Sequence, residues 1–412
     1  MGVVQTVLPF KLAATEEIVT VQGGLALFGE YLQAMGVRGL IDHELPRPGS
    51  AVGYCPSAHV LPLLLMLTGG GRTLEDLRVL RKDEGLRTLL DFHAIPSSDA
   101  IGDWLRRMGA DAAGGQAGLA RVNRSVLRRL LRCDERADYT LDIDATQIVA
   151  EKREAQTTYK GERGYMPMVG HIAELGVVAG YEFRPGNAAP AARNLEFLQA
   201  CACNLPKGKK ITALRADRAA YQAAIAAIPE REWQKFRDGE IAETVHCMNK
   251  SEKAFRLIVL RRSQEQDLFE NTQPYRYHAI ASNRANEDAA ATMAWYCQRG
   301  DASENRIKEL KIGFGMEHMP CGTHSANAVF FAIGVLTYNL YFGFRGLALG
   351  PACQRAQVQT VRWRLFQTAG RIVRHGRQVF LKINAAMLDV FTAIRERCAS
   401  VVREAGAVPE TS

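Results

Sequence analysis

The chain has 412 residues, a length at which two or three domains of roughly 100–200 residues each can form. Hydrophobic residues make up 47% of the chain and charged residues 23%, a composition that excludes a disordered protein and allows a sizeable buried core. A formal net charge of +8 and a pI of about 9.0 favour a polyanionic partner.

Cysteine spacing and hydropathy restrict the cellular setting. The nine cysteines include no C-x-x-C pair, which argues against a structural zinc site and for reduced thiols in a cytoplasm. The N-terminal residues lack the basic and apolar regions of a signal peptide. The most apolar run, residues 326–344, contains Thr337 and Asn339 and is shorter than a typical membrane span, so we expect a buried core helix.

The first part of the chain, from about residue 25 to 135, has the apolar periodicity of helices. Its last helix, RVNRSVLRRLLR, carries a row of arginines at three- and four-residue spacing: Arg121, Arg124, Arg128 and Arg132. Such a row is either a solvated stripe or a contact to a DNA backbone.

The pattern changes to strands at Tyr139. Three strand-like segments (TLDIDATQIVA, YMPMVGHIAEL and VVAGYEFRPGN) precede a helix over residues 192–202, the strand ITALRAD and the helix YQAAIAAI. This order predicts an α/β fold with an RNase H-like catalytic core, a mixed five-stranded sheet with flanking helices. Strand-like segments such as AFRLIVLRR then interrupt the core, and helix returns over residues 286–310.

Five regions are therefore predicted. They are an all-helical N-terminal DNA-binding region (1–135), the first part of the core (136–231), a strand-rich insertion (232–284), the last part of the core with a glutamate-bearing helix (285–345) and a basic helical C-terminal region (346–412). Between Arg345 and Arg403 eleven Lys or Arg stand against two acids, Asp389 and Glu396. This segment is either a solvated helical face or a surface that faces phosphates.

Three acids on suitable elements suggest a two-metal site. Asp142 and Asp144 lie on the same face of one strand, and burying two carboxylates costs several kcal/mol per charge unless a cation compensates. Asp217 ends the later core strand ITALRAD, and Glu304 opens a helix. Each is unremarkable alone, but two divalent cations about 3.5–4 Å apart require such a set. We expect Asp144, Asp217 and Glu304 to be catalytic, with Asp142 as a possible support.

Cations accompany the glutamate. Lys308 and Lys311 fall on the same helical face as Glu304, and Tyr296 and Arg299 precede them by about a turn. One acid for metal and several cations for phosphates on one face would suit the gripping of a DNA strand.

These stretches resemble the DDE transposases of bacterial insertion sequences that carry a Tyr-Arg-Glu-Lys signature, in particular the insertion sequence 1380-like group. The similarity extends from about residue 51 to 382 and rests on DAT at residues 144–146, RADR at residues 215–218, the spaced Tyr296, Arg299, Glu304 and Lys311, and the segments RPGNAAPAARN and CGTHSANAVFFAIGVLTYNLYF. The pattern usually has three residues between the arginine and the glutamate, and here there are four. Glu309 therefore stays as a weaker alternative to Glu304.

The resemblance implies an activity and its partners. A transposase of this kind cleaves the terminal inverted repeats of its element and transfers the strand into target DNA, with two Mg²⁺ ions (or Mn²⁺ as a substitute), as a homodimer on double-stranded DNA in the bacterial nucleoid. Arg218 would support Asp217 or contact the backbone. The insertion would supply an aromatic ring that stacks on a flipped base, for which Trp233, Trp295 and Phe236 are candidates against an equal expectation of core packing.

Two other functions remain open on the sequence. One is a structure-specific nuclease on the same fold, without strand transfer. The other is a non-catalytic DNA-binding protein descended from a transposase.

Overall fold

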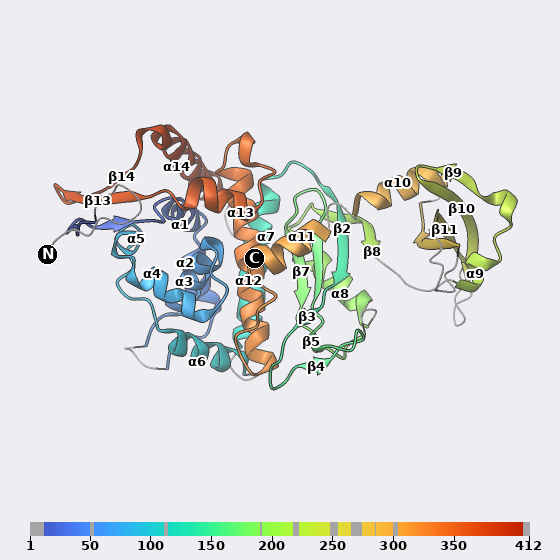
Figure 1. Ribbon diagram of the computed structural model, residues 1–412, viewed down its shortest axis with the longest axis horizontal. Helices are drawn as coiled ribbons and strands as arrows, with labels where there is room; N and C mark the ends of the chain where they lie inside the picture. Colours follow the sequence, from blue (N-terminus) through green and yellow to red (C-terminus); the bar gives the residue numbers. More distant parts are fainter. Residues whose placement is uncertain are drawn as a thin grey trace.

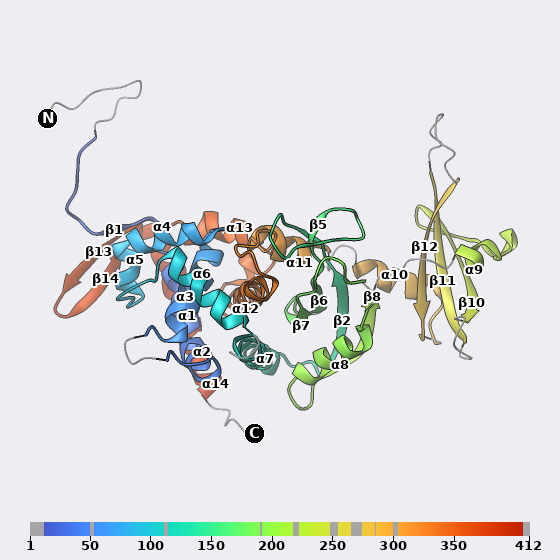
Figure 2. The ribbon, with the colours of Figure 1, turned by 90° about the horizontal axis from the view of Figure 1, so that it is seen from below.

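The structure is a computed structural model that describes residues 12–49, 53–110, 114–189, 192–216, 222–247, 254–264, 274–284, 286–299 and 304–406. These residues form a mixed α/β protein with three parts in a row: a helical part, a central sheet and a second sheet at the far end (Figures 1 and 2). N-terminal and C-terminal helices lie together in the helical part, so segments far apart in sequence share one core (Figure 1).

The long helix α12 (His324–Leu347) joins the helical part to the central sheet. It is long and apolar enough to cross a membrane, yet every residue from Ala326 to Phe344 is buried within the protein. Its neighbours include helices of the N-terminal region on one side and strand β7 (Val178–Glu182) on the other. The expectation of a core helix is confirmed, because protein surrounds the apolar residues on all sides.

The helices of the helical part are mostly amphipathic, but one of them, Pro56–Gly69, is buried along nearly its whole length. They are α1 (Leu25–Ala34), α2 (Val37–Glu44), α3 (Pro56–Gly69), η1 (Leu74–Asp76), α4 (Leu77–Lys82), α5 (Glu84–Leu89), α6 (Ser98–Gly109) and α7 (Gly115–Arg132), joined near the C-terminus by η6 (Pro351–Cys353), α13 (Val358–Val361), the π-helix η7 (Arg362–Phe366) and α14 (Ala385–Gly406). On α7 the arginine row is partly committed to the protein. Arg121 pairs with Glu44, and Arg128 donates hydrogen bonds to the carbonyls of Cys203 and Asn204.

The central sheet has the strand order β7-β6-β2-β8, where β2 is Asp138–Ala145, β6 is Met168–Ile172 and β8 is Lys210–Ala216. Strands β2, β6 and β7 are antiparallel neighbours, and β8 runs parallel to β2. Helix α8 (Asn194–Asn204) packs closely on β7, where a Cβ at Gly180 would approach the Cys201 sulfur to 2.6 Å. The five-stranded prediction is corrected here, because four strands form this sheet in the described part of the chain.

Two further sheets flank the central one. A small sheet of order β3-β5-β4 (Ile148–Val149, Arg163–Tyr165 and Gln156–Thr157) follows β2 directly. The predicted insertion strands are present as an antiparallel sheet of order β12-β11-β10-β9, made of Tyr275–Ser282, Ala254–Ser263, Gly239–Cys247 and Gln234–Phe236. Helices α9 (Gln222–Ala226), η3 (Glu230–Glu232) and α10 (Ala289–Arg299) flank that sheet. Ile258 and Leu260 pack against α10, while Leu257 and Val259 form a second apolar cluster.

The helix predicted over residues 286–310 occurs as separate pieces in the described residues. Helix α10 is followed by α11 (Asn305–Lys308), which continues into the π-helix η5 (Glu309–Gly313).

The C-terminal region is not wholly helical, and the prediction for residues 346–412 is corrected. Strands β13 (Gly370–His375) and β14 (Gln378–Lys382) form a hairpin that also pairs with β1 (Val19–Thr20). Gly376 and Arg377 both have positive φ values, 57° and 65°, which is the conformation of a two-residue hairpin turn. Because β1 lies in the N-terminal region, that region is not all-helical either.

The side chain of Asn339 takes the place of a neighbouring strand for β7. Its Oδ1 accepts a hydrogen bond from the Val178 amide (2.7 Å), and its Nδ2 donates one to the Val178 carbonyl (3.0 Å). We expect Asn339→Ala to lower the free energy of unfolding by roughly 2–6 kcal/mol, because the Val178 amide and carbonyl both lose their partner and each such buried group costs roughly 1–3 kcal/mol. Urea denaturation measures this.

Thr337→Val is the matched control on the same helix, because its hydroxyl donates to the Ile333 carbonyl one turn earlier. That change should cost less than about 1 kcal/mol. Equal stability of the Asn339→Ala variant and the unaltered protein would contradict the role given to Asn339.

Candidate active site

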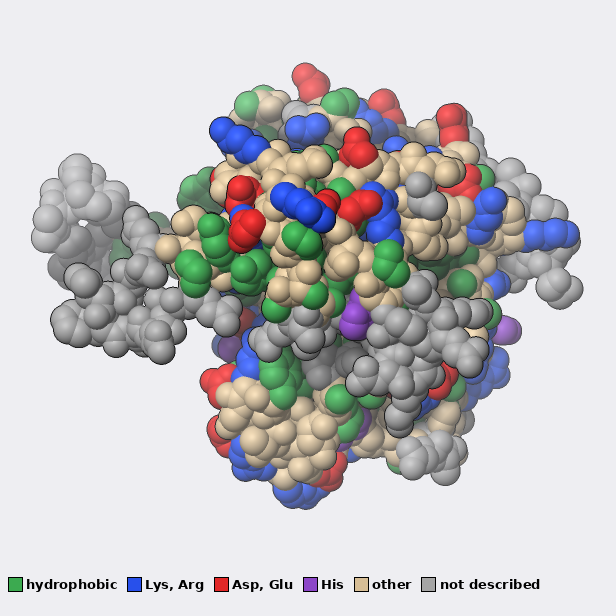
Figure 3. Space-filling model, turned by 90° about the vertical axis from the view of Figure 1, so that its right-hand side faces the viewer, with side chains coloured by type: hydrophobic (Ala, Val, Ile, Leu, Met, Phe, Trp, Pro, Cys, Tyr) green, Lys and Arg blue, Asp and Glu red, His purple; other side chains and the backbone are tan. Residues whose placement is uncertain are grey.

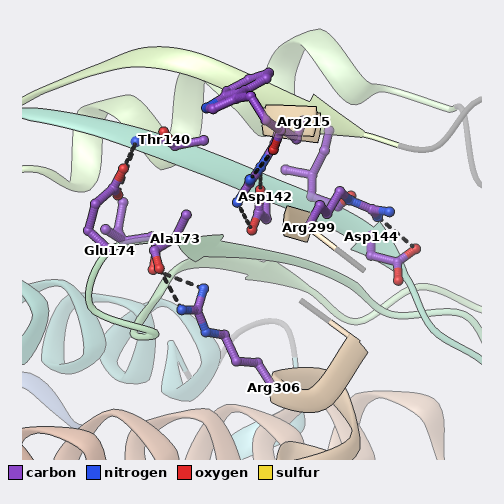
Figure 4. A network of polar contacts seen from close by, with 11 residues as sticks. Thr140, Asp142, Asp144, Ala173, Glu174, Arg215, Arg299 and Arg306 are labelled. Atoms are coloured by element: carbon purple, nitrogen blue, oxygen red, sulfur yellow. Dashed lines mark hydrogen bonds and ion pairs between the residues drawn. The ribbon is translucent and has the colours of Figure 1, made fainter. Parts of the chain in front are cut away.

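Asp142 and Arg215 form a buried ion pair between β2 and the last strand of the central sheet, β8 (Figure 4). They are register partners on the parallel strands β2 and β8, and their side chains are 0% and 4% exposed. The Arg215 guanidinium donates to both carboxylate oxygens of Asp142, at 2.6 and 2.9 Å. Asp142 is thus compensated by an arginine, the protein's own cation, rather than requiring a metal ion.

Arg215 also links the sheet to helix α10. Its Nη1 donates to the Trp295 carbonyl at 3.0 Å, and its guanidinium carbon lies 5.2 Å from the centre of the Trp295 ring. On the neighbouring strand β6, His171 is the register partner of Asp142, and burial lowers the pKa of this histidine to about 3. His171 is therefore neutral at physiological pH, which leaves Arg215 as the charge partner of Asp142.

Asp144 lies two residues further along β2 and nearer the surface. Its side chain is 31% exposed, whereas Asp142 is fully buried. The buried guanidinium of Arg299 donates to the Ile143 carbonyl (3.1 Å) and lies 3.8 Å from the Asp144 carboxylate (Figure 4). Arg299 thereby holds the end of β2 and places a positive charge beside an accessible carboxylate.

The second predicted acid, Asp217, and its neighbour Arg218 lie outside the described residues. Strand β8 ends at Ala216, the register partner of Ile143 on β2. In the sequence, the residues that follow this last pair are Asp144 and Asp217.

Glu304 stands at the start of α11 and is exposed. Two residues later, Arg306 anchors this helix by donating to the carbonyls of Ile172 and Ala173 at the end of β6 (Figure 4). Lys308 is exposed. Lys311 is half-buried and donates to the Gln147 carbonyl at 2.6 Å, and burial lowers the pKa of this lysine.

The alternative acid, Glu309, faces into the protein. Its Oε1 accepts a hydrogen bond from the Val358 amide at 2.8 Å, and burial raises the pKa of its carboxyl group. Glu309 thus holds α13 against η5, whereas Glu304 presents an exposed carboxylate to solvent.

The aromatic candidates are engaged with the protein. Trp233 lies 4.2 Å from the guanidinium of Arg261, and Trp295 has Arg284 at 4.3 Å in addition to Arg215. Tyr296 is buried in the cluster beneath the insertion sheet, with Phe236 packed against the same cluster. In the structure these rings contact other residues of the protein, and so does the buried Arg299.

The accessible carboxylates of Asp144 and Glu304 are the hard oxygen donors that Mg²⁺ prefers. In the described part of the chain, which omits Asp217, no group of three His, Cys, Asp or Glu side chains comes together. The two described acids fit the chemistry of a magnesium site, and Arg299 would orient one of them.

Arg215 and Arg306 are the site residues that the sequence analysis missed. An arginine inside the strand ITALRA is a usable signal, because a guanidinium buried in a sheet must have an acidic partner.

Residues 223–402 match the family model described as Transposase DDE domain group 1; this range includes Glu304 and begins after Asp144 and Asp217. A comparison with curated proteins gives no match. Among solved structures, the cryo-EM structure of a piggyBac transposase synaptic complex with hairpin DNA aligns with a TM-score of 0.38 and 8% identity, over 97% of this chain and 86% of that chain. The family match supports a DDE transposase.

Proposed function

We propose that this protein is a cut-and-paste DNA transposase of the DDE class, resembling the insertion sequence 1380-like group, built on an RNase H-like core. The proposal rests on the arrangement of side chains at the end of strand β2. There an accessible carboxylate, Asp144, is held by the buried Arg299 and lies two residues from a fixed ion pair. The family match over residues 223–402 supports the same class.

Asp144, Asp217 and Glu304 would hold two Mg²⁺ ions, which supply Lewis-acid stabilisation of phosphate charge and a lowered pKa for water. The buried guanidinium of Arg299 orients the Asp144 carboxylate, and Arg306 fixes the helix that begins after Glu304. Lys308 is exposed on that helix and can contact a DNA phosphate.

The proposed reaction proceeds in two transfers at one site. Water adds to the phosphorus at the element end, and the bond to the 3′ oxygen breaks to leave a 3′ hydroxyl. That hydroxyl then attacks a phosphodiester of the target DNA and displaces its 3′ oxygen. Two element ends must be joined, so a homodimer on double-stranded DNA in the bacterial cytoplasm is the expected working form.

The test of function uses the DNA that flanks the gene as substrate. With Mg²⁺, we expect the purified protein to cut duplexes that carry the flanking inverted repeats and to join them to a target plasmid, detected as covalent products on a denaturing gel. Duplexes with scrambled ends should be neither cut nor joined. Cutting of both substrates without joining would indicate a structure-specific nuclease, and metal-independent binding alone would indicate a non-catalytic descendant.

Substitutions of Asp142 and Asp144, both on β2, should have different effects. Asp144→Asn should lower Mg²⁺-dependent cleavage by more than the roughly 10–100-fold typical of an outer-shell partner, with thermal stability nearly unchanged, because this side chain is partly exposed. Asp142→Asn leaves Arg215 buried without a counter-charge and should destabilise the fold by roughly 3–5 kcal/mol. Cleavage assays and urea denaturation of both variants measure the difference.

Asp217→Asn should match Asp144→Asn, with cleavage lost and binding of element ends largely retained. Full cleavage by either the Asp144→Asn or the Asp217→Asn variant would refute the assignment of that residue.

Glu304 and Glu309 can be separated by matched amide substitutions. Glu304→Gln should abolish cleavage, whereas Glu309→Gln should retain it, since an amide oxygen can still accept the Val358 hydrogen bond. Because burial raises the pKa of Glu309 in the folded state, its stabilising contribution is complete below the ordinary value of 4.5 and is lost as pH rises through the raised value.

The Glu309→Gln variant should therefore equal the unaltered protein in stability near pH 4 and exceed it at pH 8, as measured by denaturation at each pH. Lost cleavage in Glu309→Gln with retained cleavage in Glu304→Gln would reverse the assignment of the third acid.

A further inference from the structure

The hairpin of β13 and β14, residues 370–382, extends outward from the helical part of the molecule and is called the arm here (Figures 1 and 2). Strand β1 pairs with the arm at its base, at Gly370 and Arg371, and next to this pairing the Ile372 amide donates to the Ile18 carbonyl. Beyond the base, the described partner of β13 is β14, so the outer half of the arm is a two-stranded ribbon.

The two faces of the arm have different surroundings. Residues directly opposite each other on antiparallel strands point to the same face. One face carries Ile372, which is buried against the helical part, and Arg374, which donates to the Thr88 hydroxyl. The other face carries the cross-strand pairs Arg371–Lys382, Val373–Phe380 and His375–Gln378. On this outer face Phe380 is 43% exposed, and Lys382, His375 and Gln378 are exposed.

The charge of the arm is of one sign. It contains Arg371, Arg374, Arg377 and Lys382, and no Asp or Glu occurs from residue 370 to 388. At its base Arg371 pairs with Glu17. The insertion is different, because several of its arginines pair with acids, as Arg261 does with Glu230 of η3 and Glu240 of β10. Acidic and basic side chains are accordingly intermixed on the end face of the molecule (Figure 3).

The tip of the arm places an arginine where the backbone disfavours one. Arg377 has a φ of 65°, and asparagine or glycine adopts that conformation more readily than other residues. The turn geometry therefore gives no reason for an arginine, whereas an exposed guanidinium at the end of a ribbon can reach a phosphate.

We propose that the arm binds duplex DNA by laying its outer face in the major groove. This groove is about 12 Å wide and admits a two-stranded β-ribbon. Phe380 would make apolar contact with base edges such as thymine methyl groups, while Arg377 and Lys382 contact the phosphates on either side. The proposal rests on the proposed function, and it adds a binding element remote from the acidic site (Figure 1).

The test measures binding of a fluorescein-labelled duplex by the full chain, by fluorescence anisotropy without Mg²⁺ and at several salt concentrations. The double variant Arg377→Asn, Lys382→Gln keeps the turn and removes two charges. It should bind roughly tenfold more weakly, with the slope of log affinity against log salt shallower by about 2. Phe380→Ala should weaken binding and leave the slope unchanged, because an apolar contact releases no counterions.

Lys207→Ala is the control, since Lys207 is an exposed lysine in the turn between α8 and β8, two elements that lie away from the arm in both views. Its affinity and slope should equal those of the unaltered protein. A duplex whose major groove is filled by glucosylated cytosines should bind the unaltered protein as weakly as the double variant. Circular dichroism melting confirms that all variants fold.

Several results would overturn the proposal. If the unaltered protein binds DNA and the arm variants bind it equally well, the arm is not a DNA contact, although the proposed function stands. If netropsin, which occupies the minor groove, competes with the protein and glucosylation has no effect on binding, the assignment of the arm to the major groove is wrong. If light scattering without DNA shows that the variants lose a dimer, the exposed edge of β14 contacts a second copy instead. If the unaltered protein binds no DNA, the proposed function itself fails.

Discussion

The buried pair of Asp142 and Arg215 is the constraint on which the candidate site depends. Two opposite charges taken out of water are tolerated only when they meet in good geometry, and here the guanidinium spans both carboxylate oxygens. Since the two residues are register partners on β2 and β8, any slip between these strands would separate them. The pair therefore fixes the register between β2, which carries Asp144, and β8, which Asp217 follows in the sequence. The additional hydrogen bond from Arg215 to the Trp295 carbonyl ties the same register to helix α10.

Much of the fold could be predicted from local pattern. The strand that bears Asp142 and Asp144, the helix α12 and the strands of the insertion all show their periodicity in the sequence. The arm could not be found by charge, because its arginines resemble a solvated helical face. The apolar residues on both sides of Gly376, in RIVRH and QVFLK, were the better signal, since two short runs of this kind joined by a glycine-containing turn favour a hairpin.

The site was less predictable, because the burial of a side chain depends on residues that are distant in the sequence. Spacing placed Asp142 and Asp144 on one face, but only the pairing with Arg215, 73 residues away, shows that Asp142 is neutralised within the protein. In the same way, spacing grouped Arg299 with cations for DNA, whereas the fold buries it against β2. From the sequence alone, Glu304 and Glu309 are equally plausible as the third acid. The structure distinguishes them, because Glu309 accepts a hydrogen bond from the Val358 amide.

The arginines that contribute to the net charge of +8 are of two kinds, buried and exposed. Buried ones join elements: Arg362 donates to the carbonyls of Leu67, Thr68 and Gly313, and thereby satisfies the C-terminal end of α3 while holding η5. Burial lowers the pKa of Arg362 to about 10, so it remains charged at neutral pH. Such residues cannot contribute phosphate contacts without dismantling the fold. The charge available to a polyanion is therefore smaller than composition suggests, and it is concentrated where acids are missing from the sequence, as they are along the arm.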